Sequence, residues 1–219
     1  MDLTLFVTYG PLLLKGIYYT LYVCAGALVI GLLGGMLLCL LGQQPRGPIP
    51  LLTRLYVTLF RGTPLLVQIY LVYYGGPFIG LEFSELQVGI GGLGLYCAAY
   101  FAEIFRAGYQ SVPKGQLEAA VDLGLSGPQI FWQVRLPQML TLILPTILNQ
   151  TILMVKESAI LSVITVPEMT TSATKMSTET FSVVEPYLFL AVTYWVITYL
   201  LSQLARRLEQ RTNRHLAST

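Results

Sequence analysis

Charged residues are scarce in this sequence. Of its 219 residues, 11% are charged and 54% are hydrophobic, and the mean hydropathy is +0.65. Soluble domains carry about 25% charged residues, because polar groups must cover their surface. The deficit excludes an ordinary soluble domain and indicates that lipid surrounds much of the chain. The net charge of +2 is too small to indicate nucleic acid as a partner.

Histidine and cysteine are also scarce. His215, the only histidine, lies in the polar C-terminal tail, and Cys24, Cys39 and Cys97 all lie in apolar segments. None of these residues has the spacing of a metal site, so we expect no metal and no histidine-based catalysis. The nucleotide-binding pattern GxxxxGK[ST] is absent as well, so we expect this chain to bind no ATP itself.

Long apolar runs, in contrast, are abundant. A helix needs about 20 mostly apolar residues to cross a bilayer. Five segments approach or exceed that length, at about 16–41, 55–78, 88–109, 139–164 and 187–204. They predict an all-α fold, an integral membrane bundle of about five transmembrane helices in a single domain over residues 1–219. Pro145 would break the helical hydrogen-bond ladder of the fourth span, and a kink there would be useful for gating, although proline is also ordinary in membrane helices. Ala27, Gly31 and Gly35 predict a close helix contact.

Basic residues are distributed unevenly between the connecting segments. With the N-terminus outside, the inner segments hold Arg46, Arg54, Lys114, Arg135, Arg206, Arg207, Arg211 and Arg214, and the outer segments hold Lys15 and Lys175. Cytoplasmic loops are the ones enriched in Lys and Arg. We therefore predict an outside N-terminus, a cytoplasmic C-terminus and cytoplasmic residues 113–138, with Arg61 near the inner headgroups.

Residues 113–138, PKGQLEAAVDLGLSGPQIFWQVRLPQ, form a polar stretch between two apolar spans. Two stripes recur every four residues: Leu117, Val121 and Leu125, and the acidic pair Glu118 and Asp122. This spacing predicts a short helix with one apolar and one acidic stripe.

The second half of the stretch predicts a bend and a new helix. Gly124 can end the first helix by adopting a positive φ. Ser126, Pro128 and Gln129 have the spacing of an N-cap, a first-turn proline and a capping box. An amphipathic helix lying on headgroups would have a basic polar face, which this stretch lacks. The pattern therefore favours a protein partner over a lipid surface.

The segment EAAVDLGLSGPQIFWQVRLP, residues 118–137, resembles the cytoplasmic EAA motif of type I ABC importer permeases. Glu118, Ala119, Ala120 and Gly124 match the motif, as do Leu136 and Pro137, with Val134 where the family often has Ile. Residues 59–75, 98–120 and 155–169 are similar to permeases for polar amino acids. A departure is Ala159-Ile160, where members often have Ser-Leu.

The resemblance implies a transport subunit that catalyses no reaction itself. Its coupling helix would dock on a separate ATPase through Glu118, Ala119, Ala120, Asp122 and Gly124. Two ATPase subunits would bind ATP and Mg, while a second permease, identical or paralogous, completes the pathway. An extracytoplasmic binding protein would deliver the amino acid, and the complex would be a multi-pass assembly in the bacterial inner membrane.

Four charged residues lie within the apolar spans: Glu103, Arg106, Lys156 and Glu157. Charges at membrane depth are costly and usually face a bundle interior or a cavity. A free amino acid carries an ammonium and a carboxylate, so these residues are candidate substrate-binding groups, with Gln68 and Ser158 adding hydrogen bonds. Alternatively, Glu103 and Arg106 neutralise each other as a structural i,i+3 pair.

Two further functions stay open from the residues alone. One is a membrane-embedded enzyme that uses Glu103, Glu118 and Asp122 as acids. The other is a passive channel or structural subunit with no ATPase. The threonine-rich segment 169–179 would either contact a binding protein or cap the bundle.

Overall fold

The computed structural model describes residues 4–44 and 47–217, and side chains as far as Gln210. Arg46 and the side chains of Arg211, Arg214 and His215 lie outside the described residues. Within them the regular elements are helical: α1 (Thr4–Gly42), α2 (Ile49–Gly62), α3 (Leu65–Gly75), a 3-10 turn (Gly76–Ile79), α4 (Glu85–Gln110), α5 (Lys114–Asp122), α6 (Gly127–Gln129), a π-helical segment (Ile130–Arg135), α7 (Leu136–Glu157), a 3-10 segment (Ser158–Ile164), α8 (Met169–Thr180) and α9 (Val184–Ala217).

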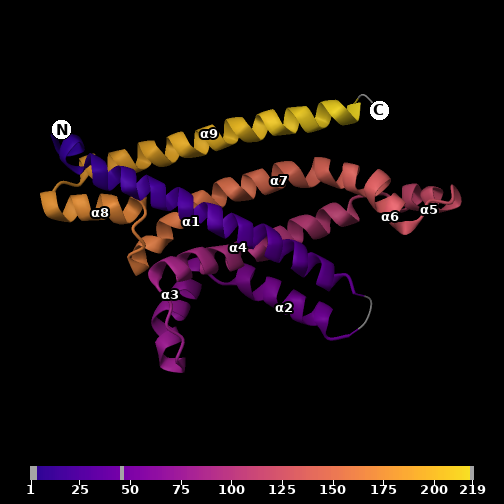
Figure 1. Ribbon diagram of the computed structural model, residues 1–219, viewed down its shortest axis with the longest axis horizontal. Helices are drawn as coiled ribbons and strands as arrows, with labels where there is room; N and C mark the ends of the chain where they lie inside the picture. The colour runs from indigo at the N-terminus through magenta and orange to yellow at the C-terminus, as the bar shows by residue number, and fades with distance from the viewer. Residues whose placement is uncertain (1–3, 45–46, 218–219) are drawn as a thin grey trace.

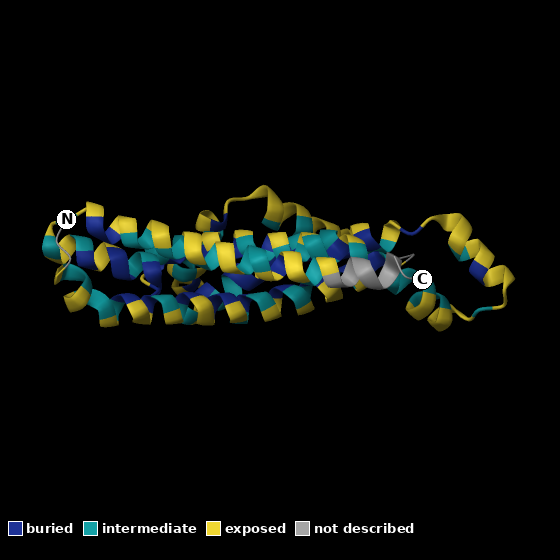
Figure 2. Ribbon diagram, turned by 90° about the horizontal axis from the view of Figure 1, so that it is seen from above, coloured by how far each residue is buried: buried dark blue, intermediate teal, exposed yellow. Residues whose placement is uncertain are grey.

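The helices form an elongated bundle, and the two described ends of the chain lie toward opposite ends of its long axis (Figure 1). The N-terminal end of α1 lies beside α8. The C-terminal end of α9 lies toward the other end, with the end of α1 and the start of α2 on the same side of the molecule. There, α5 and α6 project beyond the other helices, and they are largely exposed (Figure 2).

Four helical segments are long and apolar enough to cross a membrane, and a bent pair, α2 with α3, raises the number to as many as five. The expected membrane bundle of about five spans is therefore supported in outline. One detail of the prediction is wrong, because residues 55–78 do not form one continuous helix. The axis bends by 103° between α2 and the helical segment Leu65–Ile79.

The bend follows from Pro64. A residue before proline avoids the α conformation, and proline has no N–H to continue a helical ladder. Thr63 accordingly has φ −120° and ψ 146°, and Pro64 has ψ 137°, so two consecutive residues are extended. Pro145 behaves differently, because α7 continues through it without a break.

The core of the bundle is built on α1 and α4, the helix pair with the most extensive contact. Ala27, Gly31 and Gly35 are all buried on the α4-facing side of α1. A Cβ atom on Gly35 would lie 2.6 Å from the Cβ of Phe101 and 2.9 Å from the backbone nitrogen of Ala102. The predicted small-residue contact is thus confirmed, and its partner is α4.

The threonine-rich segment forms α8. Its buried face consists of Met169, Ser172, Ala173 and Met176, and it packs against α1 and α9. The backbone N–H of Met169 donates to the buried hydroxyl oxygen of Thr20 on α1, at 3.1 Å. These contacts make α8 part of the bundle at the end that holds the described N-terminus.

Candidate functional sites

The projecting segment, residues 113–135, is called the knob below. Its first helix, α5, ends at Asp122, and Gly124 follows with φ +77°. The Gly124 N–H donates to the Val121 carbonyl at 2.8 Å, and the Leu125 N–H donates to the Ala120 carbonyl at 3.1 Å. This pair of bonds is the Schellman arrangement, which requires the left-handed conformation that glycine adopts without strain. The predicted helix end at Gly124 is confirmed.

The predicted restart is confirmed as well. Ser126 is the N-cap residue of α6, and its N–H and hydroxyl both donate to Gln129 Oε1, at 2.8 Å and 2.7 Å. Pro128 stands in the first turn, where its missing N–H leaves no bond unmade. The chain then stays helical through the π-helical segment and into α7.

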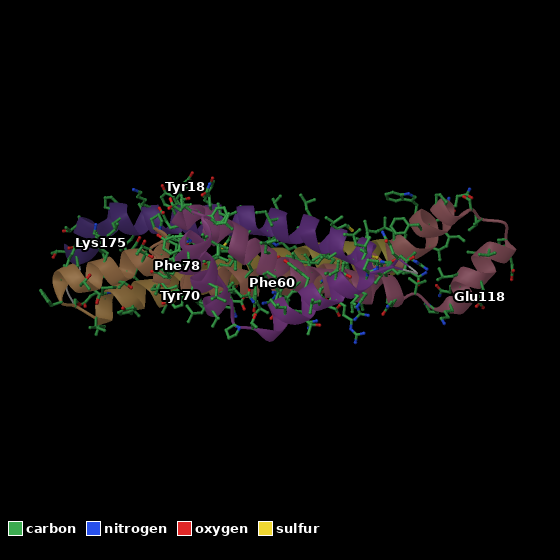
Figure 3. All side chains as sticks on the ribbon, turned by 90° about the horizontal axis from the view of Figure 1, so that it is seen from below. Tyr18, Phe60, Tyr70, Phe78, Glu118 and Lys175 are labelled. Atoms are coloured by element: carbon green, nitrogen blue, oxygen red, sulfur yellow. The ribbon has the colours of Figure 1, made fainter. Side chains whose placement is uncertain are left out.

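The predicted side-chain stripes of the knob need a correction. Val121, expected in the apolar stripe, is 60% exposed, whereas Ala120 is 4% exposed. Leu125 lies beyond the end of α5 at Asp122, so it belongs to the turn and does not continue the helical face of Leu117 and Val121. Glu118, Ala119 and Asp122 are exposed. Figure 3 shows Glu118 at the knob, far from Lys175 at the other end of the bundle.

A row of polar side chains runs along one face of α4: Tyr96, Tyr100, Glu103, Arg106 and Gln110. Their spacing of three or four residues places them on one side of the helix. We call this row, together with Glu157 at one end and Arg61 beside it, the polar track.

Successive members of the polar track are in contact. The Tyr96 hydroxyl donates to Glu157 Oε1 at 3.4 Å and lies 3.0 Å from the Tyr100 hydroxyl. The Arg61 guanidinium carbon lies 5.3 Å from the centroid of the Tyr100 ring. One end of the track therefore joins α4 to α7, and its middle joins α4 to α2.

The charged part of the track is an ion-pair cluster. Arg106 donates to both carboxylate oxygens of Glu103, at 2.6 Å from Nη2 and 3.0 Å from Nε, and its Nη1 donates to Gln110 at 2.9 Å. Arg61 Nη1 lies 3.7 Å from Glu103 Oε2. The expected pairing of Glu103 with Arg106 is therefore present, in bidentate geometry, and Arg61 points toward this pair.

A cavity of about 940 Å³ opens beside the cluster, between α1, α2 and α4. Its lining includes Arg54, Arg61 and Arg106 as cations and Glu103 as the anion, with Tyr100 and Gln110 among the neutral groups. Three guanidinium groups against one carboxylate make the cavity attractive to an anionic group. Charges that face a cavity inside an apolar bundle are typical of solute pathways.

The remaining candidate residues lie apart from this cavity. Gln68 Nε2 donates to the Phe60 carbonyl at 3.0 Å, the Thr63 carbonyl at 3.2 Å and the Thr63 hydroxyl at 2.8 Å. It thereby binds carbonyl oxygens at the end of α2, beside the α2–α3 break. Ser158 is fully buried and donates to the Val155 carbonyl at 2.7 Å. Lys156 is exposed.

Sequence reasoning missed four members of the polar track: Tyr96, Tyr100, Gln110 and Arg61. The two tyrosines were detectable in principle, because they continue the Glu103–Arg106 face with helical spacing. Arg61 was assigned to the headgroups, and only the packing of α2 on α4 brings it to Glu103. Among the described residues, no group of three or more His, Cys, Asp or Glu could hold a metal ion.

Known proteins are similar to this chain over most of its length. Residues 17–214 match the family described as "Binding-protein-dependent transport system inner membrane component". A probable amino-acid permease protein of Bacillus subtilis, YxeN, is 34% identical over 205 residues, 92% of either chain. The arginine transport system permease protein ArtQ of Bacillus subtilis is 32% identical over 212 residues, 96% of this chain and 97% of ArtQ.

Solved structures are similar too. An amino acid ABC transporter crystallised with histidines is 38% identical, with a TM-score of 0.91 over 96% of this chain and 99% of that chain. The MetNI methionine ABC transporter in an inward-facing conformation has a TM-score of 0.74 at 20% identity, covering 97% of this chain and 99% of that one. The similarity to MetNI supports a shared fold only.

Proposed function

The chain belongs to the family of inner-membrane components of binding-protein-dependent transport systems, and on that premise we propose that it is the permease subunit of an ATP-driven importer of polar amino acids. The observation that carries this proposal is the 38% identity and TM-score of 0.91 to an amino acid ABC transporter over nearly the whole chain. The subunit is a multi-pass membrane protein, and its work is transport rather than covalent chemistry.

The partners follow from this role. Two copies of an ATPase bind ATP and Mg, a second permease of the same or a paralogous sequence faces this one, and an extracytoplasmic protein delivers the amino acid. The assembly lies in the inner membrane of a bacterium, with the N-terminus outside and the C-terminus in the cytoplasm. In support, the knob and the C-terminal end of α9 lie toward the same end of the bundle (Figure 1).

The knob docks on the ATPase. Its exposed surface combines the carboxylates of Glu118 and Asp122 with the aliphatic side chains of Val121 and Leu123, which are 60% and 80% exposed. Ala120 packs inward, and Gly124 supplies the turn that holds α5 in place. A rigid, partly apolar protrusion of this kind fits a cleft on a partner protein.

The polar track and its cavity carry the solute. A zwitterionic amino acid needs groups of both signs, and the cavity has an excess of guanidinium groups for the carboxylate. Glu157 suits the ammonium, since its Oε2 is buried and has no hydrogen-bond partner among the described residues. Lys156 lies next to Glu157 on α7 and supplies a further cation. The bonds of Gln68 and Ser158 favour structural roles for those two residues.

Each step of transport then becomes a shift between two conformations. ATP binding closes the ATPase pair and tilts the docked knobs, and the cavity between the paired permeases opens outward to receive the amino acid. Hydrolysis resets the cavity inward. ATP drives this change only because it binds one conformation more tightly than the other.

Two classes of variant test the proposal in the complex reconstituted with its ATPase and binding protein. Glu118→Ala and Gly124→Asp alter the knob, and the ATPase should no longer copurify. Glu157→Gln alters the track, so the ATPase should copurify normally while ATP-dependent amino acid uptake falls by about tenfold or more, as expected for a lost charge–charge contact.

Three results would contradict the proposal. One is an ATPase that does not copurify with the unaltered permease. Another is uptake that needs no ATP, which is the behaviour of a passive channel. The third is Gly124→Asp protein that still binds the ATPase. Ala107→Ser, at an exposed position of α4, is the matched control. It should leave both ATPase copurification and ATP-dependent amino acid uptake unchanged.

A further inference from the structure

The knob is joined to the rest of the bundle in two unlike ways. On one side the chain is helical without interruption from α6 through the π-helical segment into α7. On the other side, α4 ends at Gln110, and Pro113, with φ −58° and ψ 135°, separates it from α5. An extended proline breaks the backbone hydrogen-bond ladder. The backbone therefore ties the knob firmly to α7 and loosely to α4.

One side-chain contact bridges the loose side. The guanidinium carbon of Arg135, the last residue of the π-helical segment, lies 3.8 Å from the centroid of the Tyr109 ring in the last turn of α4. A planar guanidinium stacks closely on an aromatic face, and the ring's negative face attracts the cation. This contact connects the α7 side of the knob to α4.

The surroundings of Arg135 Nε indicate that the stack stabilises this side chain. Its Nε is buried and has no hydrogen-bond partner among the described residues. A buried donor without a partner is unfavourable, so the residue depends on the ring for compensation. The position is also within a π-helical segment, a geometry that occurs frequently at functional sites.

A second contact holds the knob against α7. Gln138 Nε2, in the first turn of α7, donates to Gln116 Oε1 of α5 at 2.7 Å and to the Val134 carbonyl at 3.2 Å. Helix α5 is thus bonded to the start of α7. This bond joins α5, the π-helical segment and α7 into one unit. Arg135 links that unit to the last turn of α4, beside the direct packing of Gly108 on Met139 and Ile143 of α7.

Tyr109 is adjacent to Gln110 and three residues from Arg106, the charged end of the polar track. A displacement of Tyr109 therefore displaces the track. We propose that the Arg135–Tyr109 stack is the positioning contact through which movement of the docked knob is transmitted to α4 and its polar track. This inference rests on the proposed function, because it assumes that an ATPase moves the knob.

The test compares variants of the reconstituted complex by amino acid transported per ATP hydrolysed. Arg135→Gln removes the cation, and Tyr109→Leu removes the ring. Each should retain the ATPase and lower the transport yield per ATP by about fivefold or more, the lower range of allosteric coupling. The double variant should be no worse than either single variant, because both remove the same contact.

Three controls isolate the stack. Tyr109→Phe keeps the ring face, and Gln133→Ala changes an exposed residue of the same π-helical segment, so both should transport as the unaltered complex does. Arg135→Lys keeps a cation without the planar stack and should give an intermediate yield. A knob that merely needs Arg135 to fold would instead lose the ATPase in all Arg135 variants.

The inference is overturned if the transport yield per ATP is unchanged in Arg135→Gln and Tyr109→Leu, if either variant releases the ATPase, or if the two losses multiply in the double variant. If Tyr109→Leu does not assemble, the Arg135→Gln and Arg135→Lys comparison decides alone. Failure of the proposed function looks different: the unaltered complex would then show no ATP-dependent uptake.

Discussion

Glu168 is a fully buried acidic residue that precedes α8. Its Oε2 accepts the Thr170 N–H and its Oε1 accepts the Thr171 N–H, both at 2.8 Å, so the carboxylate caps the helix. The Tyr194 hydroxyl of α9 donates to the same carboxylate at 3.3 Å. Burial raises the pKa of Glu168 above its ordinary value, and the two N–H bonds offset only part of this rise.

This raised pKa predicts a pH-dependent stability. The folded protein holds the Glu168 proton more tightly than the unfolded chain does. The contribution to stability is therefore complete below the ordinary glutamate pKa of about 4.3 and is lost as pH rises through the folded-state value. Relative to Glu168→Gln, the unaltered protein should lose thermal stability in detergent as pH rises from about 4 toward neutrality.

The measurement is the difference in melting temperature between the two proteins across that pH range. Glu82→Gln, which changes an exposed carboxylate, is the control and should give a difference that stays flat with pH. A flat difference for Glu168→Gln as well would show that its burial has no energetic consequence.

Gln68 illustrates how a residue that attracts attention in the sequence can have a local structural task. An amide inside an apolar span suggests a solute contact, because polar groups in lipid are expensive. Two of its three acceptors are carbonyl oxygens at the end of α2, and the third is the Thr63 hydroxyl. The carbonyl oxygens need partners because the helix ends there. The sequence shows Pro64, but it does not show that Gln68 bonds to the end of α2. That contact exists only because the chain bends between α2 and α3.

At the scale of whole helices, the contact between α1 and α4 depends on the absence of side chains. Gly35 lies against the Phe101 side chain and the Ala102 backbone, neither of which can move aside freely. Gly91, inside α4, has no atom within 4 Å of an added Cβ. Alanine substitutions at these two glycines therefore distinguish the effect of packing on stability from the effect of helix propensity.

Gly35→Ala should destabilise the protein by about 1–3 kcal/mol through overpacking. Gly91→Ala should be neutral or stabilising by up to about 1 kcal/mol, because alanine is the better helix former. The measurement is the melting temperature of each variant by size-exclusion chromatography in detergent. Equal melting temperatures for the two variants would contradict the close α1–α4 contact.

The helix boundaries were predictable to different degrees. Apolar length located α1, α4, α7 and α9, because crossing a bilayer imposes a minimum run of apolar residues. The same criterion predicted one span where the structure has two helices, α2 and α3. A count of apolar residues does not show where the helix axis changes direction. The knob was predictable in detail, because Gly124 and Ser126 act through bonds within a few residues of themselves.

At the scale of the whole molecule, the bundle has two chemically distinct ends. Lys175 marks the end with α8, and Glu118 marks the end with the knob (Figure 3). The positive-inside rule assigns the knob end to the cytoplasm. Cysteine labelling can test this orientation, because the native residues Cys24, Cys39 and Cys97 are free and buried and can be replaced by alanine.

In that cysteine-free background, a membrane-impermeant maleimide should label Lys175→Cys in intact cells. Glu118→Cys should react only after the cells are broken. The reverse pattern would overturn the orientation and, with it, the placement of the knob on the cytoplasmic side. Equal labelling of both positions before lysis would indicate that the chain inserts in both orientations.

The sequence alone determined the membrane bundle and the knob, and it offered a Glu103–Arg106 pair as one of two alternatives. Each of these depends on residues that are close in the chain, where helical periodicity and short-range bonds set the geometry. Tertiary structure decided that Arg61 faces Glu103, that Tyr96 meets Glu157 and that Arg135 stacks on Tyr109. These contacts join residues on different helices, so they exist only because close packing of the helices fixes how each one is rotated against its neighbours.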